Sequence, residues 1–163
     1  MIYREETINA IKDIILLKEE TLSVAESVTA GHLQAAFSTA MDASKYFQGG
    51  ITAYNLGQKA RHLNVEPILA GKTNCIEQRI ANTMAIEVAR MFLSNYGIAI
   101  TGYAAMVPEC EEDGLFAYFA LSYNLEVVLT KRLTSPEKHP HDVQVDYANK
   151  VVQSVYDYLS TKQ

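Results

Sequence analysis

Three side chains in the first half of the chain have the chemistry needed for acyl transfer. Ser27 follows a short apolar run, Tyr54 ends a second one, and Lys59 comes five residues after Tyr54. A serine hydroxyl becomes a nucleophile when a neighbouring base removes its proton. A lysine can be that base once burial disfavours its ammonium form, and a tyrosine hydroxyl can relay a proton or orient the lysine. We therefore predict a catalytic set of Ser27, Tyr54 and Lys59.

Each of these residues also has an ordinary structural role. Serine and threonine are common helix N-caps, so Ser27 fits a cap as well as a nucleophile. Tyr54 is one of ten tyrosines, and an aromatic residue at a strand end often fills the core. A lysine on a short helix, such as Lys59, is usually a solvated charge. The spacing alone therefore does not decide between chemistry and structure.

A strand followed directly by a helix is predicted around Ser27. Leu22–Ala25 has the apolar character of a short buried strand, and the apolar-rich run from Thr29 to Ala40 predicts a helix. A helix end of this kind presents unpaired backbone N–H groups and the positive end of the helix dipole. Because such an end favours anions, we expect the turn after Ser27 to stabilise an oxyanion or to hold a substrate phosphate.

Hydrophobic periodicity predicts the remaining elements. The expected helices are Glu5–Leu17, Thr29–Ala40, Asn55–His62, Glu77–Asn95 and His141–Leu159, and the expected strands are 22–25, 51–54, 98–101, 115–123 and 126–133. The last two strands form a hairpin that turns at Asn124, and the first of them is apolar nearly throughout, which places it inside the sheet. Gly49–Gly50 is predicted to break the chain before a strand, and 64–74 to be a connecting loop.

Helices thus alternate with strands of both orientations. This pattern predicts an α/β fold, a three-layer α/β/α sandwich with a mixed β-sheet, in a single domain spanning residues 1–163. In open sheets of this kind ligands collect beyond the carboxyl ends of the strands. We therefore expect Ser27, Tyr54 and Lys59 to meet at that edge.

Composition excludes several classes of function. The formal net charge is −5 and the pI is about 5.3, so no basic field attracts nucleic acid. Cys75 and Cys110 are too few for a disulfide framework and lack metal-ligand spacing. No apolar stretch approaches the ~20 residues that span a membrane, and the N-terminus lacks a signal-peptide pattern. We expect a cytoplasmic protein with no nucleic-acid or membrane partner and no metal.

Longer motifs extend the pattern around the three reactive residues. Ala25–Gly31 reads Ala-Glu-Ser-Val-Thr-Ala-Gly, and Tyr46–Asn55 reads Tyr-Phe-Gln-Gly-Gly-Ile-Thr-Ala-Tyr-Asn. These runs resemble the Ala-Glu-Ser-Cys-Thr-Gly-Gly and Tyr-Phe-x-Gly-Gly-x-x-x-Tyr-Ser motifs of the CinA C-terminal domain family. Lys59 and the strand ending at Gly102 stand at the family spacing. The order of elements is similar nearly from end to end.

The resemblance implies an activity, because the enzymatic members of that family are nicotinamide-nucleotide amidases. Their proposed catalytic serine, tyrosine and lysine match Ser27, Tyr54 and Lys59. The implied reaction is hydrolysis of the carboxamide of nicotinamide mononucleotide, or of a related small amide, to the acid and ammonia without a cofactor. It also suggests a homo-oligomer. The expected substrate-binding residues are Glu26, Thr29, Ala30, Gly31, Thr101 and Gly102.

The chain departs from the family pattern at several positions. Val28 replaces the motif cysteine, and Ala30 replaces the first of the paired glycines, where a methyl group crowds an approaching phosphate. Asn74–Glu77 replaces the usual Gly-Ala-Val-Ser before the long helix. The family's arginine-bearing segment before the last helix is poorly matched. His139 and His141 stand there instead, and we expect them at the surface because no third metal ligand is evident.

The largest departure is the segment Tyr103–Gly114, which replaces a glycine-rich family loop. A glycine-rich loop offers backbone donors to an anion, whereas this segment carries Glu109, Glu111, Glu112 and Asp113. We expect these carboxylates to be solvated, as in most connecting loops. Two main hypotheses follow: an amidohydrolase that uses Ser27, or a catalytically silent relative that binds a nucleotide or a protein partner. A purely structural oligomer subunit is a third.

Overall fold

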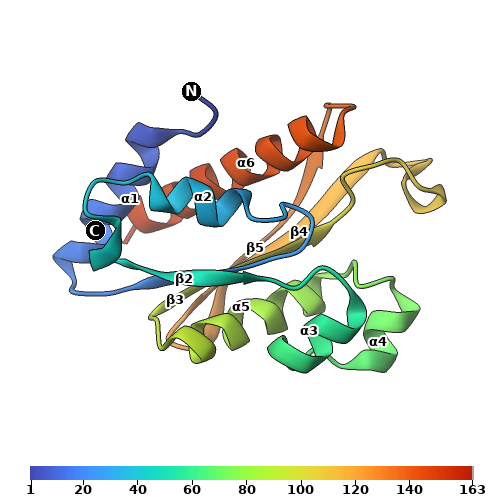
Figure 1. Cartoon of the computed structure of the whole chain (residues 1–163), viewed down its shortest axis with the longest axis horizontal. Coiled ribbons are helices and arrows are strands. Elements are labelled where there is room, and N and C mark those ends of the chain that lie inside the picture. Colours follow the sequence, from blue (N-terminus) through green and yellow to red (C-terminus); the bar gives the residue numbers. More distant parts are fainter. Residues whose placement is uncertain (163) are drawn as a thin grey trace.

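The computed structural model describes residues 1–162. It contains a five-stranded sheet that lies between two layers of helices (Figure 1). The elements are α1 (Glu5–Leu17), β1 (Leu22–Glu26), α2 (His32–Ser38), η1 (Ala43–Lys45), β2 (Phe47–Thr52), α3 (Leu56–Leu63), α4 (Pro67–Lys72), α5 (Gln78–Phe92), β3 (Tyr96–Gly102), η2 (Pro108–Cys110), β4 (Leu115–Tyr123), β5 (Glu126–Ser135) and α6 (Pro140–Ser160). Within the described residues, no helix is both long and apolar enough to cross a bilayer.

The sheet has the strand order β2-β1-β3-β4-β5. β1 runs parallel to β2 and β3, whereas β4 is antiparallel to both β3 and β5. Helices α1, α2 and α6 cover one face and α3, α4 and α5 lie on the other (Figure 1). The predicted α/β sandwich with a mixed sheet is therefore confirmed. The prediction that the strand 115–123 lies inside the sheet is also correct.

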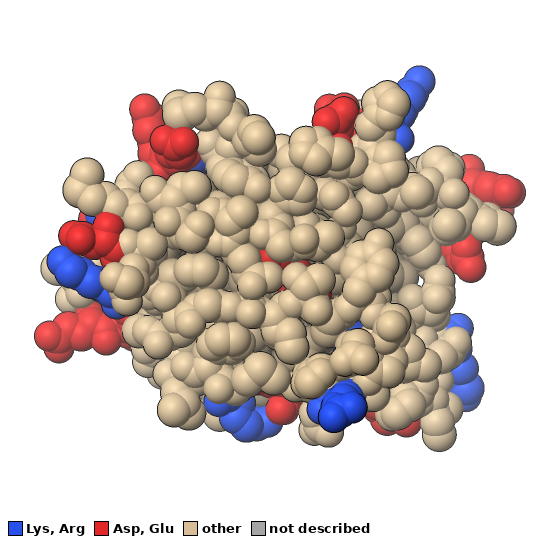
Figure 2. Space-filling model, viewed as in Figure 1, with Lys and Arg blue, Asp and Glu red and all other residues tan. Residues whose placement is uncertain are grey.

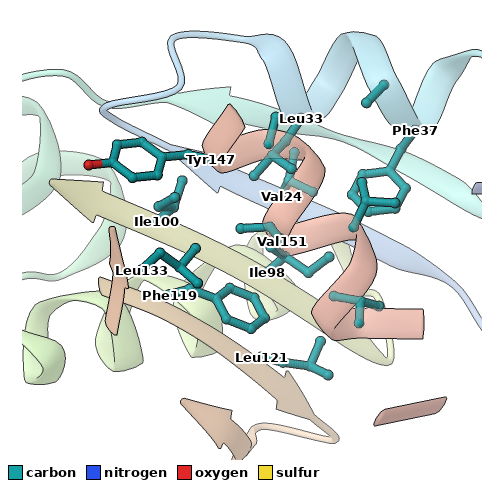
Figure 3. Close-up of a cluster of buried hydrophobic side chains, with 14 of the residues drawn as sticks. Val24, Leu33, Phe37, Ile98, Ile100, Phe119, Leu121, Leu133, Tyr147 and Val151 are labelled. Carbon is teal, nitrogen blue, oxygen red and sulfur yellow. The ribbon is translucent and has the colours of Figure 1, made fainter. Parts of the chain in front are cut away.

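The two faces of the sheet are packed differently. On the side of α1, α2 and α6, large residues of the central strands contact large residues of the helices (Figure 3): Val24, Ile98, Ile100, Phe119 and Leu121 face Leu33, Phe37, Tyr147 and Val151. On the other side Ala25, Ala99 and Ala120 stand in register across β1, β3 and β4. This row of alanines lets α5 lie close to the sheet, where it buries Met84 and Val88.

Gly49 and Gly50 lie inside β2, so the prediction of a chain break followed by a strand at 51–54 is wrong. Gly50 pairs with Val24 of β1. A Cβ atom on Gly50 would lie 2.5 Å from the Val24 carbonyl oxygen and 2.8 Å from Cγ of Gln34 on α2. The glycine is needed because strand and helix approach too closely for a side chain, and not because the chain turns there.

The segment 64–74 contains the helix α4, so the prediction of a plain loop is also wrong. Pro67 occupies the first turn of α4, where a missing N–H group costs nothing. The Glu66 carboxylate accepts hydrogen bonds from the N–H groups of Ile68 at 3.0 Å and Leu69 at 2.7 Å. Proline and glycine in this short segment indicated a loop, but the first is a helix start and Gly71 is tolerated inside the helix.

Candidate active site

Three parallel strands end at the same edge of the sheet, and the reactive residues follow them. Ser27 comes directly after β1, Tyr54 lies two residues beyond β2, and Gly102 ends β3. Lys59 reaches the same place from α3, which Asn55 begins by accepting the N–H of Gln58. The topology therefore brings Ser27, Tyr54 and Lys59 together, as the strand order along the chain predicted.

Ser27 and Lys59 form a buried pair. Lys59 Nζ lies 2.9 Å from Ser27 Oγ, and the two residues are 1 % and 5 % exposed. Burial lowers the pKa of Lys59 from its usual value, and the neighbouring Cys75 opposes this shift. A lowered pKa makes the neutral amine accessible closer to neutral pH. The amine can then accept the proton of the serine hydroxyl, which is what a nucleophilic serine requires.

Tyr54 contributes its main chain to this pair. Its carbonyl oxygen accepts a hydrogen bond from Lys59 Nζ at 3.2 Å, whereas its side chain is 64 % exposed. Over residues 1–162 the Tyr54 hydroxyl forms no hydrogen bond, so the structure does not show the expected contact between this hydroxyl and the lysine. The reason is that β2 ends at Thr52 and leaves Tyr54 in the connecting turn. The ring forms part of the pocket wall.

The side chain of Glu26, the last residue of β1, binds the N-terminal end of α2, whose N-cap residue is Gly31. This side chain is fully buried and accepts five hydrogen bonds. Oε2 accepts the Thr29 hydroxyl at 2.5 Å and the N–H groups of Gly31 and Leu33 at 3.1 and 2.9 Å. Oε1 accepts the main-chain and side-chain N–H groups of Gln34 at 2.8 and 3.2 Å. The carboxylate thus occupies the helix end that we expected to hold a substrate anion.

This arrangement corrects the role expected for four residues. Glu26 and Thr29 are fully buried, and their polar atoms are bound to each other and to α2. The Ala30 N–H donates to the Ser27 carbonyl oxygen at 3.1 Å, and the Gly31 N–H donates to Glu26. None of Glu26, Thr29, Ala30 and Gly31 lines the pocket described below. They shape the turn that carries Ser27 and are not part of the pocket lining.

One backbone donor beside Ser27 remains available. The N–H of Val28 donates to no acceptor within the described part of the chain, and Val28 lines the pocket. An N–H group that follows the nucleophile directly is well placed to bind an oxyanion. The N–H groups of Ala30 and Gly31 are bonded within the turn, so Val28 offers the candidate donor nearest to Ser27.

Thr101 and Gly102 contribute to the site in different ways. Thr101 is fully buried, and its hydroxyl donates to the Cys75 carbonyl oxygen at 2.7 Å. This bond holds a turn in which Asn74 and Cys75 both have left-handed backbones, with φ of +50° and +63°. Gly102 lines the pocket itself, and a Cβ there would lie 2.3 Å from Cβ of Ala117. Of these two residues, Thr101 stabilises the turn at Asn74 and Cys75, and Gly102 lines the pocket.

A pocket of about 560 Å³ opens over the pair, which is within the usual range for small-molecule sites. It is lined by Ser27, Val28, Tyr54, Asn55, Leu56, Lys59, Ala70, Gly71, Asn74, Cys75, Ile76, Gly102, Tyr103 and Ala104. Sequence reasoning missed the wall formed by α4 and the turn after it. The signal that would have found it is the cap Glu66 followed by Pro67, which together mark a helix start.

The acidic segment lies away from this pocket. The lining ends at Ala104, and Glu109, Glu111, Glu112 and Asp113 are all exposed, as expected for a solvated loop. Figure 2 shows acidic side chains at the edge of the molecule where Figure 1 places this loop. An ion pair of 3.2 Å joins Asp113 to Arg132 of β5. These carboxylates are therefore not part of the pocket lining.

His139 and His141 are exposed, as predicted. His141 Nδ1 lies 3.2 Å from Oδ1 of Asp142, and its ring stacks edge-on against His32 with 5.3 Å between ring centres. Among residues 1–162, no group of three or more histidine, cysteine or acidic side chains is arranged to hold a metal ion.

Comparison with known proteins matches residues 4–159 to the CinA C-terminal domain. The CinA-like protein of Prochlorococcus marinus is 41% identical over 101 residues, which cover 61% of this chain and 24% of that protein. The CinA-like protein of a Picosynechococcus strain is 37% identical over 94 residues, covering 58% and 22%. The chain thus spans about a quarter of the length of these relatives.

Solved structures share the fold. The competence or damage-inducible protein from Enterobacter asburiae superimposes with a TM-score of 0.88 at 19% identity, covering 96% of this chain and 98% of that one. The competence damage-inducible protein A from Klebsiella pneumoniae gives a TM-score of 0.88 at 21% identity and covers 99% of each chain. At this level of identity, the likeness establishes the architecture alone.

Proposed function

The chain belongs to the CinA C-terminal domain family, and we propose that it is a serine amidohydrolase of the nicotinamide-nucleotide amidase type. Its substrate is a small molecule with a carboxamide, either a nicotinamide nucleotide or a related amide. The observation that carries this proposal is the buried contact of 2.9 Å between Lys59 Nζ and Ser27 Oγ. A lysine buried without an acidic partner is costly, and general-base chemistry accounts for its presence.

The reaction begins when neutral Lys59 takes the proton of Ser27 as Oγ attacks the carboxamide carbon. The carbonyl oxygen becomes an oxyanion that the Val28 N–H stabilises. Collapse of the tetrahedral intermediate breaks the C–N bond, and the Lys59 ammonium returns its proton to the departing nitrogen, which leaves as ammonia. Water then attacks the resulting ester of Ser27, with Lys59 again as the base, and the carboxylic acid is released.

Tyr54 assists through two different groups. Its carbonyl oxygen, 3.2 Å from Lys59 Nζ, fixes the amine on the side of Ser27. Its ring stands at the pocket wall and is largely exposed, so the hydroxyl acts on the bound substrate and not on the lysine. Replacing Tyr54 by phenylalanine should therefore raise KM more than it lowers kcat.

Release of ammonia from nicotinamide mononucleotide, measured against time with purified protein, tests the proposal. Ser27→Ala and Lys59→Met should each lower kcat/KM by about 10³-fold or more. Ser38→Ala removes an exposed serine hydroxyl from α2 and should leave the rate unchanged. No ammonia above the Ser27→Ala background, from mildly acidic to mildly alkaline pH and with related small amides included, would refute the amidase proposal.

The alternative is a silent family member that binds a nucleotide or a protein partner. Its basis is the replaced glycine loop, and the carboxylates of that loop lie outside the pocket. The same preparation separates the two functions. Saturable binding of a nucleotide to the wild-type protein, with no ammonia produced, would favour the silent member.

A further inference from the structure

We infer that the pocket selects a carboxamide without a phosphate group, and that it favours a riboside over the corresponding 5′-phosphate. This inference rests on the proposed amidase function and concerns which substrate the site accepts. It follows from the charge of the pocket lining, from the helix ends near it and from the side chains that form its walls.

The first observation is the charge of the lining. Of the 14 residues that line the pocket, Lys59 alone has a charged side chain. The Lys59 residue is only 1 % exposed, and its amine lies between Ser27 Oγ and the Tyr54 carbonyl oxygen. In the proposed reaction this amine is neutral when it acts as the base. If it were charged and drawn to a phosphate, it would leave Ser27. Lys59 therefore cannot pair with a phosphate during catalysis.

The second observation concerns the helix ends. The N-terminus of α2 is occupied by the Glu26 carboxylate, which accepts the N–H groups of Gly31, Leu33 and Gln34. At the start of α3 the Asn55 side chain accepts the N–H of Gln58, and the Lys59 N–H makes the first bond of the helix to the Asn55 carbonyl oxygen, so the N–H groups of Leu56 and Gly57 remain. A whole helix end supplies about half a positive charge, whereas a phosphate monoester carries about −1.5 to −2. The N–H groups of Leu56 and Gly57 that remain at this end therefore supply only a small part of the charge that would balance a phosphate.

The third observation is what the walls offer. The lining includes two aromatic residues, Tyr54 and Tyr103, and two amide residues, Asn55 and Asn74, of which Asn55 uses its side-chain oxygen to cap α3. Aromatic rings pack well against a flat heteroaromatic ring, and amides exchange hydrogen bonds with a carboxamide or a sugar hydroxyl. A phosphate placed against these walls would give up part of its water and gain no cation from the lining, which is unfavourable. A phosphate-free aromatic carboxamide meets these groups without that cost.

Gly71 allows the inference to be tested by adding a charge. It lies in α4, lines the pocket and is exposed, and a Cβ at this position meets no atom within 4 Å. Arginine also has a better helix propensity than glycine. The variant Gly71→Arg therefore introduces a guanidinium at the pocket wall without a clash. Gly71→Gln is the matched control, since it has a long polar side chain and no charge.

The experiment compares nicotinamide riboside with nicotinamide mononucleotide, which differ only by the phosphate. We expect wild-type kcat/KM to favour the riboside by about tenfold or more, equivalent to about 1.4 kcal/mol. Gly71→Arg should move the ratio towards the mononucleotide by about tenfold, and Gly71→Gln should leave the ratio unchanged. Equal use of the two compounds by the wild type, or preference for the mononucleotide, overturns the inference.

Binding to Ser27→Ala, measured by calorimetry, keeps this result separate from the amidase proposal. If neither of these compounds nor any related small amide releases ammonia from the wild type, the proposed function fails, and the ratio of the two dissociation constants still decides the inference. Tighter binding of the riboside supports phosphate exclusion. Tighter or equal binding of the mononucleotide, or binding of neither compound, overturns it.

Discussion

Two roles are conceivable for the Glu26 carboxylate: it stabilises the turn that carries Ser27, or it binds the substrate. Replacing Glu26 by glutamine distinguishes these roles. The carboxylate accepts five hydrogen bonds and is fully buried. A glutamine oxygen placed at the Oε2 position keeps the three bonds from Thr29, Gly31 and Leu33. The amide NH₂ then faces the main-chain N–H of Gln34, so that a donor meets a donor.

The expected loss of stability follows from these contacts. Two of the five bonds are lost, both from Gln34; the backbone bond to a charged acceptor alone costs roughly 1.5–3 kcal/mol, and the three retained bonds weaken because their acceptor becomes neutral. We expect the free energy of unfolding to fall by roughly 3 kcal/mol. For a domain of this size, about 2–4 °C is lost per kcal/mol, so the melting temperature should fall by roughly 6–12 °C.

Chemical and thermal denaturation of Glu26→Gln, followed by circular dichroism, measure this loss. Glu112→Gln makes the same change at an exposed position of the acidic loop and should stay within about 0.5 kcal/mol of the wild type. The reasoning is refuted if Glu26→Gln unfolds at the wild-type denaturant concentration. A raised KM for the amide at unchanged stability would instead mean that Glu26 binds substrate.

Three further changes test other parts of the structure. Lys59→Met should abolish ammonia release yet raise the free energy of unfolding by about 1–2 kcal/mol, because it removes an amine whose pKa is lowered by burial. This gain should shrink as pH rises, since the unfolded lysine also becomes neutral; denaturation at two pH values checks both points, and a loss of stability would contradict them. The wild-type kcat/KM should rise with pH through the pKa of Lys59, which lies below its usual value of 10.5; a profile that falls over this range is incompatible with a lysine base. Gly50→Ala should destabilise the protein by about 1–3 kcal/mol in a urea titration, since its Cβ would meet the Val24 carbonyl oxygen at 2.5 Å, and wild-type stability would show that β2 and α2 can separate there.

The order of elements is readable from the sequence because each long element keeps its own hydrophobic period. Strands 115–123 and 126–133 were predicted close to their observed bounds, and so was the helix 5–17. The prediction at Gly49–Gly50 was wrong because a glycine pair in a sequence is compatible both with a chain break and with a close packing contact. Only the position of α2 over β2, a long-range contact, distinguishes the two cases.

The candidate site was predictable where topology decides it. Ser27 and Tyr54 follow parallel strands, so their meeting near Lys59 follows from strand order. Whether Lys59 contacts the hydroxyl or the carbonyl oxygen of Tyr54 depends on the backbone direction in one turn. The sequence pattern does not determine that direction. The hydrogen bonds of Glu26 likewise depend on where α2 begins. The helix starts at His32, three residues later than the predicted start at Thr29.

Glu26 also has a consequence for how such a site can diversify. The buried carboxylate serves as a permanent internal counter-ion for α2, so the turn with Ser27 is ordered before any ligand arrives. The position of Ser27 is therefore set by β1 and the start of α2, whereas α4 and the residues after β3 form much of the surrounding wall. If the proposed function holds, mutations in that wall can change which amide is admitted while the turn with Ser27 keeps its shape. Substrate range and reaction chemistry are thus able to evolve separately in this fold.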